Sequence, residues 1–377
     1  MLETALAHEQ EYLSDLVSLV RFESPTHDKA ACDLLADHLE GLLSGEGWQV
    51  ARHPREQAGE ILEASIEGGG GPRTLILTHY DTVWPIGTLD RMPWRHEGDL
   101  VYGPGTCDMK AGIVSAILAI RVLREQGVEP RGDVTMLLTS DEESGSHHSR
   151  ALIESLAREH DRVLVLETGR DDGAVKIGRK GVGSYTVGFR GRSAHAGNNP
   201  KEGASALREL AHFLLFVEEL ADEAAQTTVN LTVASGGTVV NVIAEEARAK
   251  VDVRALRAGE DERIDAAIRG YRPRDSRVEV VVEGGLNRPP LEPTPANTAL
   301  WREAQERLND LGLTLEGAIV GGGSDGNFTS ALGVPTLDGL GSAGAGAHAR
   351  HEHIRLRETL ERVALLAALL AGKPNPG

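Results

Sequence analysis

The chain has 377 residues, of which 40% are hydrophobic and 25% are charged, and its formal net charge is −18. This length exceeds what one hydrophobic core usually supports, so two domains are expected. The composition excludes a disordered chain. The negative charge argues against a surface for nucleic acids or anionic membranes, and no apolar stretch is long enough to cross a bilayer.

The amino terminus lacks the basic start and apolar core of a signal peptide and instead predicts an acidic amphipathic helix. Cys32 and Cys107 are the only cysteines, too few for a disulfide framework. A cytoplasmic protein is therefore expected. Cys107 is interpreted as a packing residue, because a catalytic thiol needs a histidine partner and an activating environment.

Helix-like and strand-like patterns alternate in the first half of the chain. Helices are predicted over residues 3–20, 30–43, 111–125 and 149–158, and strands over 74–78, 134–139 and 162–166. This alternation predicts an α/β fold with a mainly parallel sheet covered by helices. In such sheets the ligand site lies at the carboxyl ends of the strands.

The pattern changes after residue 180. Strands are predicted over 184–191, 228–233, 247–256 and 277–284, with helices over 204–220 and 260–271. This βαββαβ order is the ferredoxin-like unit. A helix over 297–311, a strand over 333–340 and a final Leu/Ala-rich helix then resume the first pattern. We expect a catalytic domain formed by residues 1–180 and 288–377, with residues 181–287 inserted as a smaller domain.

Acidic and histidine side chains recur at the predicted strand ends. They are His79, Asp81, Asp108, Glu142, Glu143, Glu167 and His348. Each has a plain alternative, since the acids can cap turns or helices or form salt bridges, and the histidines can simply be exposed. Together, however, so many acids at one edge would repel one another unless cations neutralised them.

Imidazole and carboxylate ligands in one cleft suit zinc. Two Zn²⁺ ions carry four positive charges, whereas Asp108, Glu143 and Glu167 carry three negative charges, which leaves room for one hydroxide. The set therefore predicts a two-metal hydrolytic centre.

Seven segments in order then resemble the signatures of the co-catalytic zinc hydrolases that include glutamate carboxypeptidase, acetylornithine deacetylase and succinyl-diaminopimelate desuccinylase. The segments are THYDTVWP, GPGTCDMKAG, TSDEESGS, VLETG, GRSAHAGNNPKEGASA, GGGSDGNF and GAGAHARHE. The match extends in order over essentially the whole chain, and within the family it looks most similar to glutamate carboxypeptidase.

The resemblance implies a metal-binding role for five residues: His79 and Glu167 on one zinc, Glu143 and His348 on the other, and Asp108 bridging both. His348 is preferred over its neighbouring histidines because the family ligand is followed four positions later by Glu, here Glu352. Asp81 would orient His79. Cobalt or manganese can replace zinc in such sites.

The resemblance also implies the catalytic groups. Glu142 would be the general base, and His195 would donate to the oxyanion from the inserted domain, although a turn histidine is the plain alternative. In relatives the corresponding histidine enters the partner subunit's active site, which implies a homodimer through the insertion. The insertion would act as both lid and dimer contact.

Substrate recognition is implied for two groups of residues. Lys176, Asn241 and Arg254 match positions that bind the substrate carboxylate, and Gly322, Gly323 and Ser324 would form a backbone wall beside the scissile group. The plain alternatives are a surface lysine, a loop asparagine and a strand arginine paired with an acid.

Glu rather than Asp at position 167 resembles carboxypeptidases and deacylases. The expected reaction is hydrolysis of an amide in an acyl-glutamate, a folate-like conjugate or a short peptide, which releases an amino acid, with glutamate the first candidate. An N-acyl-amino-acid deacylase of the acetylornithine type is the alternative. A non-catalytic binding protein would have lost the base, the bridging acid or a ligand, and all six positions are filled by competent residues.

Overall fold

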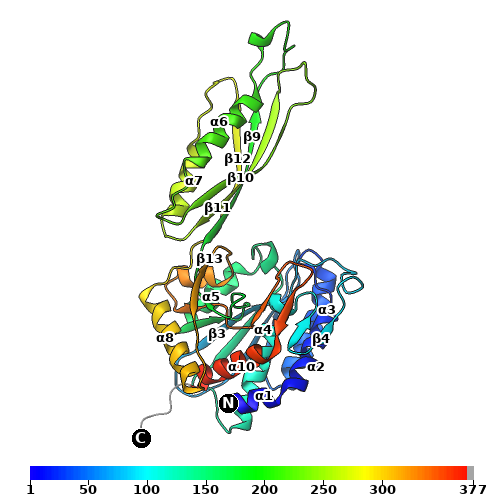
Figure 1. The fold of residues 1–377 in the computed structure, drawn as a ribbon, viewed down its shortest axis with the longest axis vertical. Coiled ribbons are helices and arrows are strands. Elements are labelled where there is room, and N and C mark those ends of the chain that lie inside the picture. The colour runs from blue at the N-terminus through cyan, green and yellow to red at the C-terminus, as the bar shows by residue number, and fades with distance from the viewer. Residues whose placement is uncertain (372–377) are drawn as a thin grey trace. The chain divides into compact units, whose positions relative to one another are not determined.

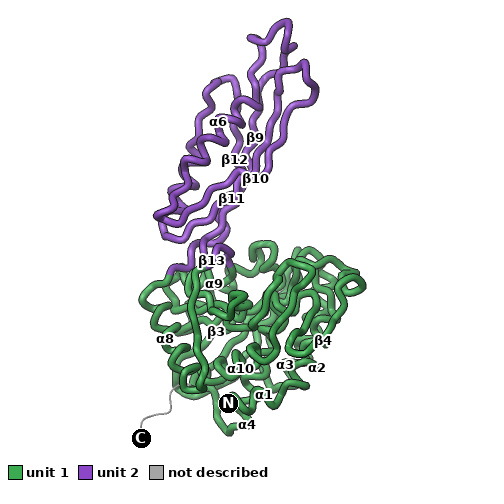
Figure 2. The backbone as a smooth tube through the Cα atoms, viewed as in Figure 1, with its two compact units in different colours: residues 1–178, 293–319, 324–377 green, residues 179–292, 320–323 purple. Residues whose placement is uncertain are grey.

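The computed structural model describes residues 1–371 and divides into two compact units (Figures 1 and 2). Unit 1 comprises residues 1–178, 293–319 and the chain from 324 onward, and unit 2 comprises residues 179–292 and 320–323. The expected insertion, 181–287, lies within the sequence of unit 2. None of the helices in residues 1–371 is long and apolar enough to span a membrane.

Unit 1 is built on a six-stranded sheet. In spatial order its strands are β1 (Gln49–His53), β2 (Ile61–Ile66), β6 (Val134–Thr139), β3 (Thr74–His79), β7 (Arg162–Val165) and β14 (Thr336–Leu337). The last four run parallel to one another, and β1 and β2 are antiparallel. Every residue of β3 is buried, as expected for a central strand covered on both faces. The mainly parallel sheet confirms the predicted fold class.

Helices cover both faces of this sheet. One face packs in a single apolar cluster with α2 (Glu9–Val20), α3 (Lys29–Gly45), α4 (Ala111–Glu125) and α10 (Leu356–Ala371). The other packs with α5 (Arg150–Glu159) and α9 (Gly326–Ala331), whose Phe328 is buried there. The chain also forms α1 (Leu2–Ala7) and α8 (Pro295–Asp310). Segments that carry candidate site residues lie at the carboxyl edge of the sheet, where the parallel strands end.

Two predicted elements were wrong in extent. The helix predicted over 3–20 is interrupted at His8, whose N–H bonds the Ala5 carbonyl in a tight turn between α1 and α2. The strand predicted over 333–340 shrinks to β14, because Pro335 has no N–H to donate and Gly333 and Gly339 have φ values of 81° and 78°.

Several short strands were not predicted. One small sheet has the order β15 (Gly344–Ala345), β16 (His353–Arg355), β5 (Leu100–Tyr102) and β4 (Arg95–Glu97). A second pairs β8 (Val175–Arg179) with β13 (Gly317–Val320). The β15–β16 pair is antiparallel, so residues 346–352, including His348, form its connecting loop.

Unit 2 has the predicted ferredoxin-like order. Its elements are β9 (Gly181–Arg190), α6 (Ala206–Glu218), β10 (Thr228–Gly236), β11 (Glu246–Ala255), α7 (Glu260–Gly270) and β12 (Glu279–Arg288). The antiparallel sheet has the order β10-β11-β9-β12. Alternate residues of β9 and β11 are buried and pack with Phe213 and Ile264 of the helices in a core separate from that of unit 1.

Candidate metal centre

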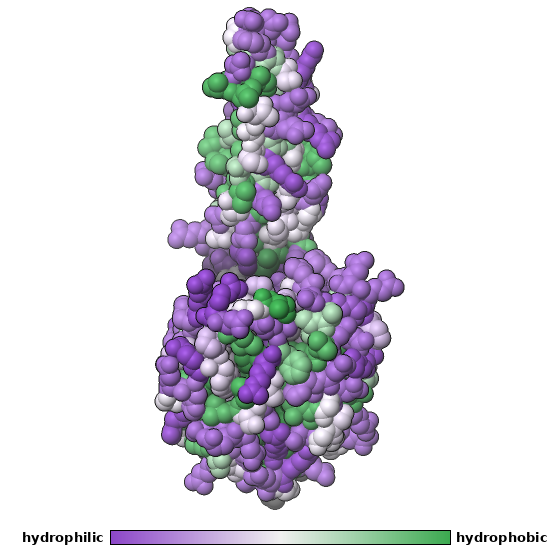
Figure 3. Space-filling view, turned by 90° about the vertical axis from the view of Figure 1, so that its right-hand side faces the viewer, coloured by the Kyte–Doolittle hydropathy of each residue, from purple (hydrophilic) through white to green (hydrophobic). Residues whose placement is uncertain are grey.

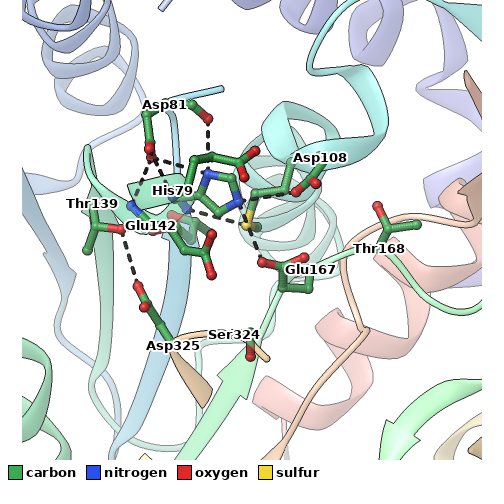
Figure 4. Close-up of polar contacts among 12 residues, drawn as sticks. His79, Asp81, Asp108, Thr139, Glu142, Glu167, Thr168, Ser324 and Asp325 are labelled. Atoms are coloured by element: carbon green, nitrogen blue, oxygen red, sulfur yellow. Dashed lines mark hydrogen bonds and ion pairs between the residues drawn. The ribbon is translucent and has the colours of Figure 1, made fainter. Parts of the chain in front are cut away.

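Parallel pairing brings the separate motifs to one edge of the unit 1 sheet. His79 is the last residue of β3 and lies in register with Thr139, the last residue of β6. Leu77 of β3 lies in register with Val165 at the end of β7. The ends of these strands therefore lie together at one edge of the sheet, where Figure 4 shows His79, Glu142 and Glu167 near one another.

Close backbone packing fixes the segment before Glu167. The carbonyl oxygen of Leu166 would lie 2.2 Å from a Cβ at Gly112 and 1.8 Å from a Cβ at Gly341. Both positions therefore require glycine. Gly341 also donates its N–H to the Glu167 carbonyl at 2.9 Å, so α4 and the chain after β14 both hold Glu167 in place.

Asp108 lies between two histidines. One of its oxygens is 3.2 Å from Nε2 of His79, and the other is 3.2 Å from Nε2 of His348. Glu167 lies 3.5 Å from Nε2 of His79, and Glu143 lies 3.1 Å from Nε2 of His348. The structure thus brings together all five residues predicted as ligands. The Asp108 carboxylate lies between the pair His79 and Glu167 and the pair His348 and Glu143.

Asp81 supports this cluster in two ways. Its carbonyl oxygen lies 3.0 Å from Nδ1 of His79 and one carboxylate oxygen lies 3.3 Å from the same nitrogen. Its carboxylate also accepts the backbone N–H groups of Glu142 at 3.3 Å and Glu143 at 3.1 Å. Because a carbonyl can only accept, Nδ1 carries the hydrogen, and Nε2 is left to face the carboxylates.

His348 adopts an unusual backbone conformation. Its φ is 62°, in the left-handed region that residues with a Cβ seldom occupy. Such conformations persist where the surroundings impose them and cluster at functional sites. Here the side chain is turned from the β15–β16 loop toward Asp108 and Glu143.

The electrostatics of the cluster are those of a site that needs cations. Burial alone would lower the pKa of His79, but hydrogen bonds to Asp108, Asp81 and Glu167 outweigh it and hold that pKa well above its usual value. Hydrogen bonds to Asp108 and Glu143 raise the pKa of His348 to about 11. Without a metal, protons on the imidazoles must neutralise the carboxylates.

The two carboxylates beside His348 respond in opposite directions. Burial opposes ionisation of Asp108, yet the hydrogen-bonding histidines lower its pKa. Burial and the neighbouring Asp108 charge raise the pKa of Glu143 to about 7. Two anions therefore compete for the same positive charge, which a divalent cation would supply to both.

The donor set fits a pair of divalent metals. Ligand atoms lie within 4.8 Å of one another in two groups, His79 with Asp108 and Glu143, and His79 with Glu142 and Glu167. Oxygen Oε1 of Glu143 is buried without a hydrogen-bond partner among the described residues, which leaves it available to a cation. Imidazole nitrogens and carboxylate oxygens are ligands that zinc accepts.

A buried network behind the cluster was not predicted. Asp325 accepts a hydrogen bond from the hydroxyl of Thr139 (Figure 4) and another from the hydroxyl of Ser146. It thereby ties the GGGSDG segment to the TSDEES segment. The local sequence carries no signal for these contacts, because Asp325 and Ser146 are 179 residues apart. Glu352, noted in the sequence only for its spacing from His348, is also fully buried.

His195 lies in unit 2 on an exposed loop after β9. Its Nδ1 accepts the backbone N–H groups of Gly197 and Asn198, both at 3.1 Å. A neutral imidazole with an accepting Nδ1 carries its hydrogen on Nε2. His195 therefore presents an N–H donor at the ring edge away from its own loop.

The candidate carboxylate-binding residues are dispersed. Lys176 lies on β8 in unit 1, with its backbone N–H bonded to the Asp338 carbonyl. In unit 2, Asn241 is an exposed loop residue. Arg254 on β11 pairs with Asp252 at 2.9 Å, which is the plain alternative considered for it. The structure does not bring these residues into one cluster within a single unit.

The predicted backbone wall is also divided. The carbonyls of Gly322 and Gly323, in unit 2, each accept from the Arg179 guanidinium at 3.2 Å. Ser324 belongs to unit 1, where it is fully buried and donates its hydroxyl to Asp338. Its hydroxyl is therefore engaged in the packing of unit 1.

Acids and imidazoles at the carboxyl edge of a mainly parallel sheet define the class of this protein as a metal-dependent hydrolase. Comparison with known proteins agrees. The model of peptidase family M20/M25/M40 matches residues 75–372, and the chain belongs to this family. The resemblance found in the sequence is thus confirmed.

The relatives span nearly the whole chain. Carboxypeptidase G2 of Pseudomonas sp. (strain RS-16) is 31% identical and covers 98% of this chain and 91% of its own. Succinyl-diaminopimelate desuccinylase of Granulibacter bethesdensis is 27% identical and covers 94% and 95%. Aminopeptidase PepT of Bacillus cereus superposes with a TM-score of 0.81 over 96% and 98% of the two chains at 22% identity, which shows a shared fold. The chain is accordingly a metallopeptidase or amidohydrolase.

Proposed function

We propose that the protein is a di-zinc carboxypeptidase, which hydrolyses an amide bond and releases a C-terminal amino acid, with glutamate as the first candidate. The observation that carries the proposal is the placement of Asp108, with one oxygen toward His79 and the other toward His348. The 31% identity with carboxypeptidase G2 over 98% of the chain supports a carboxypeptidase activity.

In this proposal His79 and Glu167 would hold one zinc, Glu143 and His348 would hold the other, and Asp108 would serve as a ligand to both. Bound zinc supplies a Lewis acid for the scissile carbonyl and lowers the pKa of the attacking water. Co²⁺ or Mn²⁺ can use the same nitrogen and oxygen donors. Asp81 keeps the Nδ1 hydrogen of His79 in place, so that Nε2 remains the donor atom.

Glu142 is the general base. Its carboxylate belongs to the same close group as His79 and Glu167, and its backbone is anchored by Asp81. It takes a proton from the attacking water and later delivers it to the leaving amine. Asp81 thus holds the base Glu142 and the ligand Glu143 in place by accepting their adjacent backbone N–H groups.

Substrate handling is assigned to residues that match the substrate positions of the family, and these come from both units. The Nε2–H of His195 donates to the oxyanion that develops on the scissile carbonyl. Arg254, together with Lys176 and Asn241, binds the substrate carboxylate. Gly322, Gly323 and Ser324 line the scissile group with backbone atoms. Support for these roles comes from the matched motifs and from the donor tautomer of His195.

The enzyme acts as a homodimer through unit 2, with His195 entering the partner's active site. In the sheet of unit 2, β10 is an edge strand. Val233 of β10 is 53% exposed, and Leu207 and Leu215 of α6 are 42% and 55% exposed. Figure 3 shows apolar residues among hydrophilic ones on this unit. An apolar helix face beside an unpaired strand edge suits association with a second copy.

We place the enzyme in the cytoplasm. Cys32 and Cys107 are both buried and free rather than paired, which suits a reducing compartment. The negative net charge suits a small-molecule or short-peptide substrate rather than nucleic acid or a membrane.

A second candidate is an N-acyl-amino-acid deacylase of the acetylornithine type. The 27% identity with a succinyl-diaminopimelate desuccinylase, over 94% of the chain, favours it. The same metals, base and oxyanion donor serve both reactions. Both substrates carry a free α-carboxylate on the amine side of the amide, so the two candidates differ in the shape and charge of the pocket that receives the rest of the substrate.

Release of free amino acid from a substrate panel tests the proposal. The panel contains acyl-glutamates, pteroyl-glutamate, dipeptides and N-acetylornithine, each with zinc-loaded and with chelated protein. Metal-dependent release of glutamate supports the carboxypeptidase. Preference for N-acetylornithine supports the deacylase instead, and the absence of metal-dependent turnover across the panel contradicts both.

A further inference from the structure

Glu352 holds the backbone of the loop that carries Asp108. Its Oε1 accepts the N–H groups of Cys107 at 2.9 Å and Asp108 at 3.1 Å. Its Oε2 accepts the N–H of Gly105 at 3.0 Å and the indole N–H of Trp84 at 2.8 Å. One fully buried carboxylate therefore receives four hydrogen bonds from two segments that are distant from it in sequence.

This loop satisfies only some of its own backbone groups, such as the N–H of Lys110, which donates to the Gly105 carbonyl. Gly105 has φ 72°, in the left-handed region, and Asp108 has φ −124° and ψ 92°, outside the helical region. Their N–H groups consequently have no place in a regular helix or ladder, and buried N–H groups need a partner. On the opposite side of the loop, the hydroxyl of Thr168 donates to the Cys107 carbonyl.

We propose that Glu352 is a positioning residue that aims the carboxylate of Asp108 at both metal positions. The inference rests on the proposed two-metal site, and it adds a role that the ligand set alone does not contain. Asp108 can face His79 and His348 at equal distances only while its own N–H is held. The Glu352 bond to that N–H lies directly beside the bridging side chain.

The ionised carboxylate is required, because all four of its partners are donors. An amide at position 352 would turn its NH₂ group toward two of them, and those two hydrogen bonds would be lost. Trp84 donates one of the four hydrogen bonds to Glu352 from outside the loop. Its removal should therefore disturb the position of Glu352 less than a change of Glu352 itself. This gives two variants of graded severity, Glu352→Gln and Trp84→Phe.

Calorimetric titration of metal-free protein with Zn²⁺ tests the inference without relying on activity. We expect Glu352→Gln to weaken zinc binding about 10- to 100-fold, as for other groups that support metal ligands. Both sites should weaken together, because Asp108 serves both. Trp84→Phe should weaken binding in the same direction by a smaller factor, and it serves as the test if Glu352→Gln does not fold.

Glu209→Gln is the matched control. Glu209 is also a buried carboxylate that accepts two backbone N–H groups, those of Arg274 at 2.9 Å and Asp275 at 3.0 Å, but it lies in unit 2. It should lower the melting temperature and leave zinc affinity unchanged. Glu352→Gln should instead reduce the rise in melting temperature that zinc produces, which a purely structural role would not alter.

The outcomes separate this inference from the proposed function. If the unaltered chain binds no zinc, the proposed function fails and the inference fails with it. If the unaltered chain binds two zinc ions and both Glu352→Gln and Trp84→Phe bind them equally well, the inference alone is overturned. Weaker binding in both, with the Glu209→Gln chain unaffected, supports it.

Discussion

The two units hold their functional residues in different ways. In unit 1, His79 and Asp81 are buried at the end of a central strand, and the neighbouring ligands are fixed by backbone hydrogen bonds. In unit 2, His195 is exposed and its ring accepts hydrogen bonds only from its own loop, and Arg254 is paired with an acid two residues away. The candidate metal ligands thus all lie within one unit, whereas the residues proposed to bind the substrate are divided between the two units.

The largest effect should follow from replacing Asp108, the residue proposed to serve both metals. We expect Asp108→Asn to lower kcat/KM on the order of 10⁴-fold or more, because bound metals supply several kcal/mol of transition-state stabilisation at 1.36 kcal/mol per tenfold. Metal content, measured by elemental analysis, should fall with activity. Chelation of the unaltered enzyme should have the same effect and be reversed by Zn²⁺. An Asp108→Asn enzyme with two metals and full activity would contradict the bridging role.

Removing the base should separate chemistry from metal binding. We expect Glu142→Gln to lower kcat by about 10²- to 10⁴-fold, the usual contribution of a general base, while metal content stays at the level of the unaltered enzyme. Steady-state kinetics and elemental analysis measure the two quantities. Glu159→Gln, at an exposed acid that ends α5 of the same unit, is the control and should leave both unchanged. Loss of metal from Glu142→Gln would make Glu142 a ligand instead.

Replacing His195, the proposed oxyanion donor, tests whether catalysis depends on unit 2. We expect His195→Ala to lower kcat by about 10²- to 10³-fold, the range for loss of one oxyanion donor, with zinc affinity unchanged because none of the proposed metal ligands lies in unit 2. Kinetics and zinc titration check this. His212→Ala, on α6 of the same unit, should have little effect. A change in zinc affinity on His195→Ala would contradict the division of labour between the units.

Mixed dimers sharpen the same test. If His195 acts across the dimer, mixing the His195→Ala and Glu142→Gln chains creates dimers with one intact site. Random exchange of subunits should then restore about a quarter of normal activity, since half the dimers are mixed and each has one working site of two. Activity that stays at the level of the separate variants after proven subunit exchange would show that His195 acts within its own chain.

The sequence predicted the parts of the molecule whose signal is local. Helix α4 and strand β6 have the predicted limits, because their apolar runs are bounded by loop residues. The five candidate ligands could be grouped because most of them follow strand ends, and parallel strands end at one edge. The break at His8 was missed because the amphipathic pattern continues across it.

The remaining features depend on contacts between distant residues. The role of Glu352 requires Trp84 and Asp108, which lie 268 and 244 residues away in sequence. The cis peptide bond after Asp108 has no proline to signal it. For Arg254, the sequence left a substrate role and an ion pair open, and the structure contains that ion pair within unit 2.

The smallest expected effect addresses that open alternative. Arg254 contacts Asp252 through Nε and Nη2, and its Nη1 is 3.4 Å from the Gly321 carbonyl. If its planar fork also binds the substrate carboxylate, Arg254→Lys should raise KM about tenfold and change kcat less than about twofold, because lysine keeps the charge but loses the two-point geometry.

Arg248→Lys is the matched control for this change. Arg248 is exposed on the same strand, β11, and pairs with Glu283 at 3.6 Å. If Arg254 serves only to pair with Asp252, neither Arg254→Lys nor Arg248→Lys should change KM. The melting temperatures of the two variants should then differ only slightly. A KM effect confined to Arg254→Lys, and larger for substrates with a free α-carboxylate than for their amides, would instead assign the guanidinium to the substrate. It would show that unit 2 supplies binding as well as the oxyanion donor.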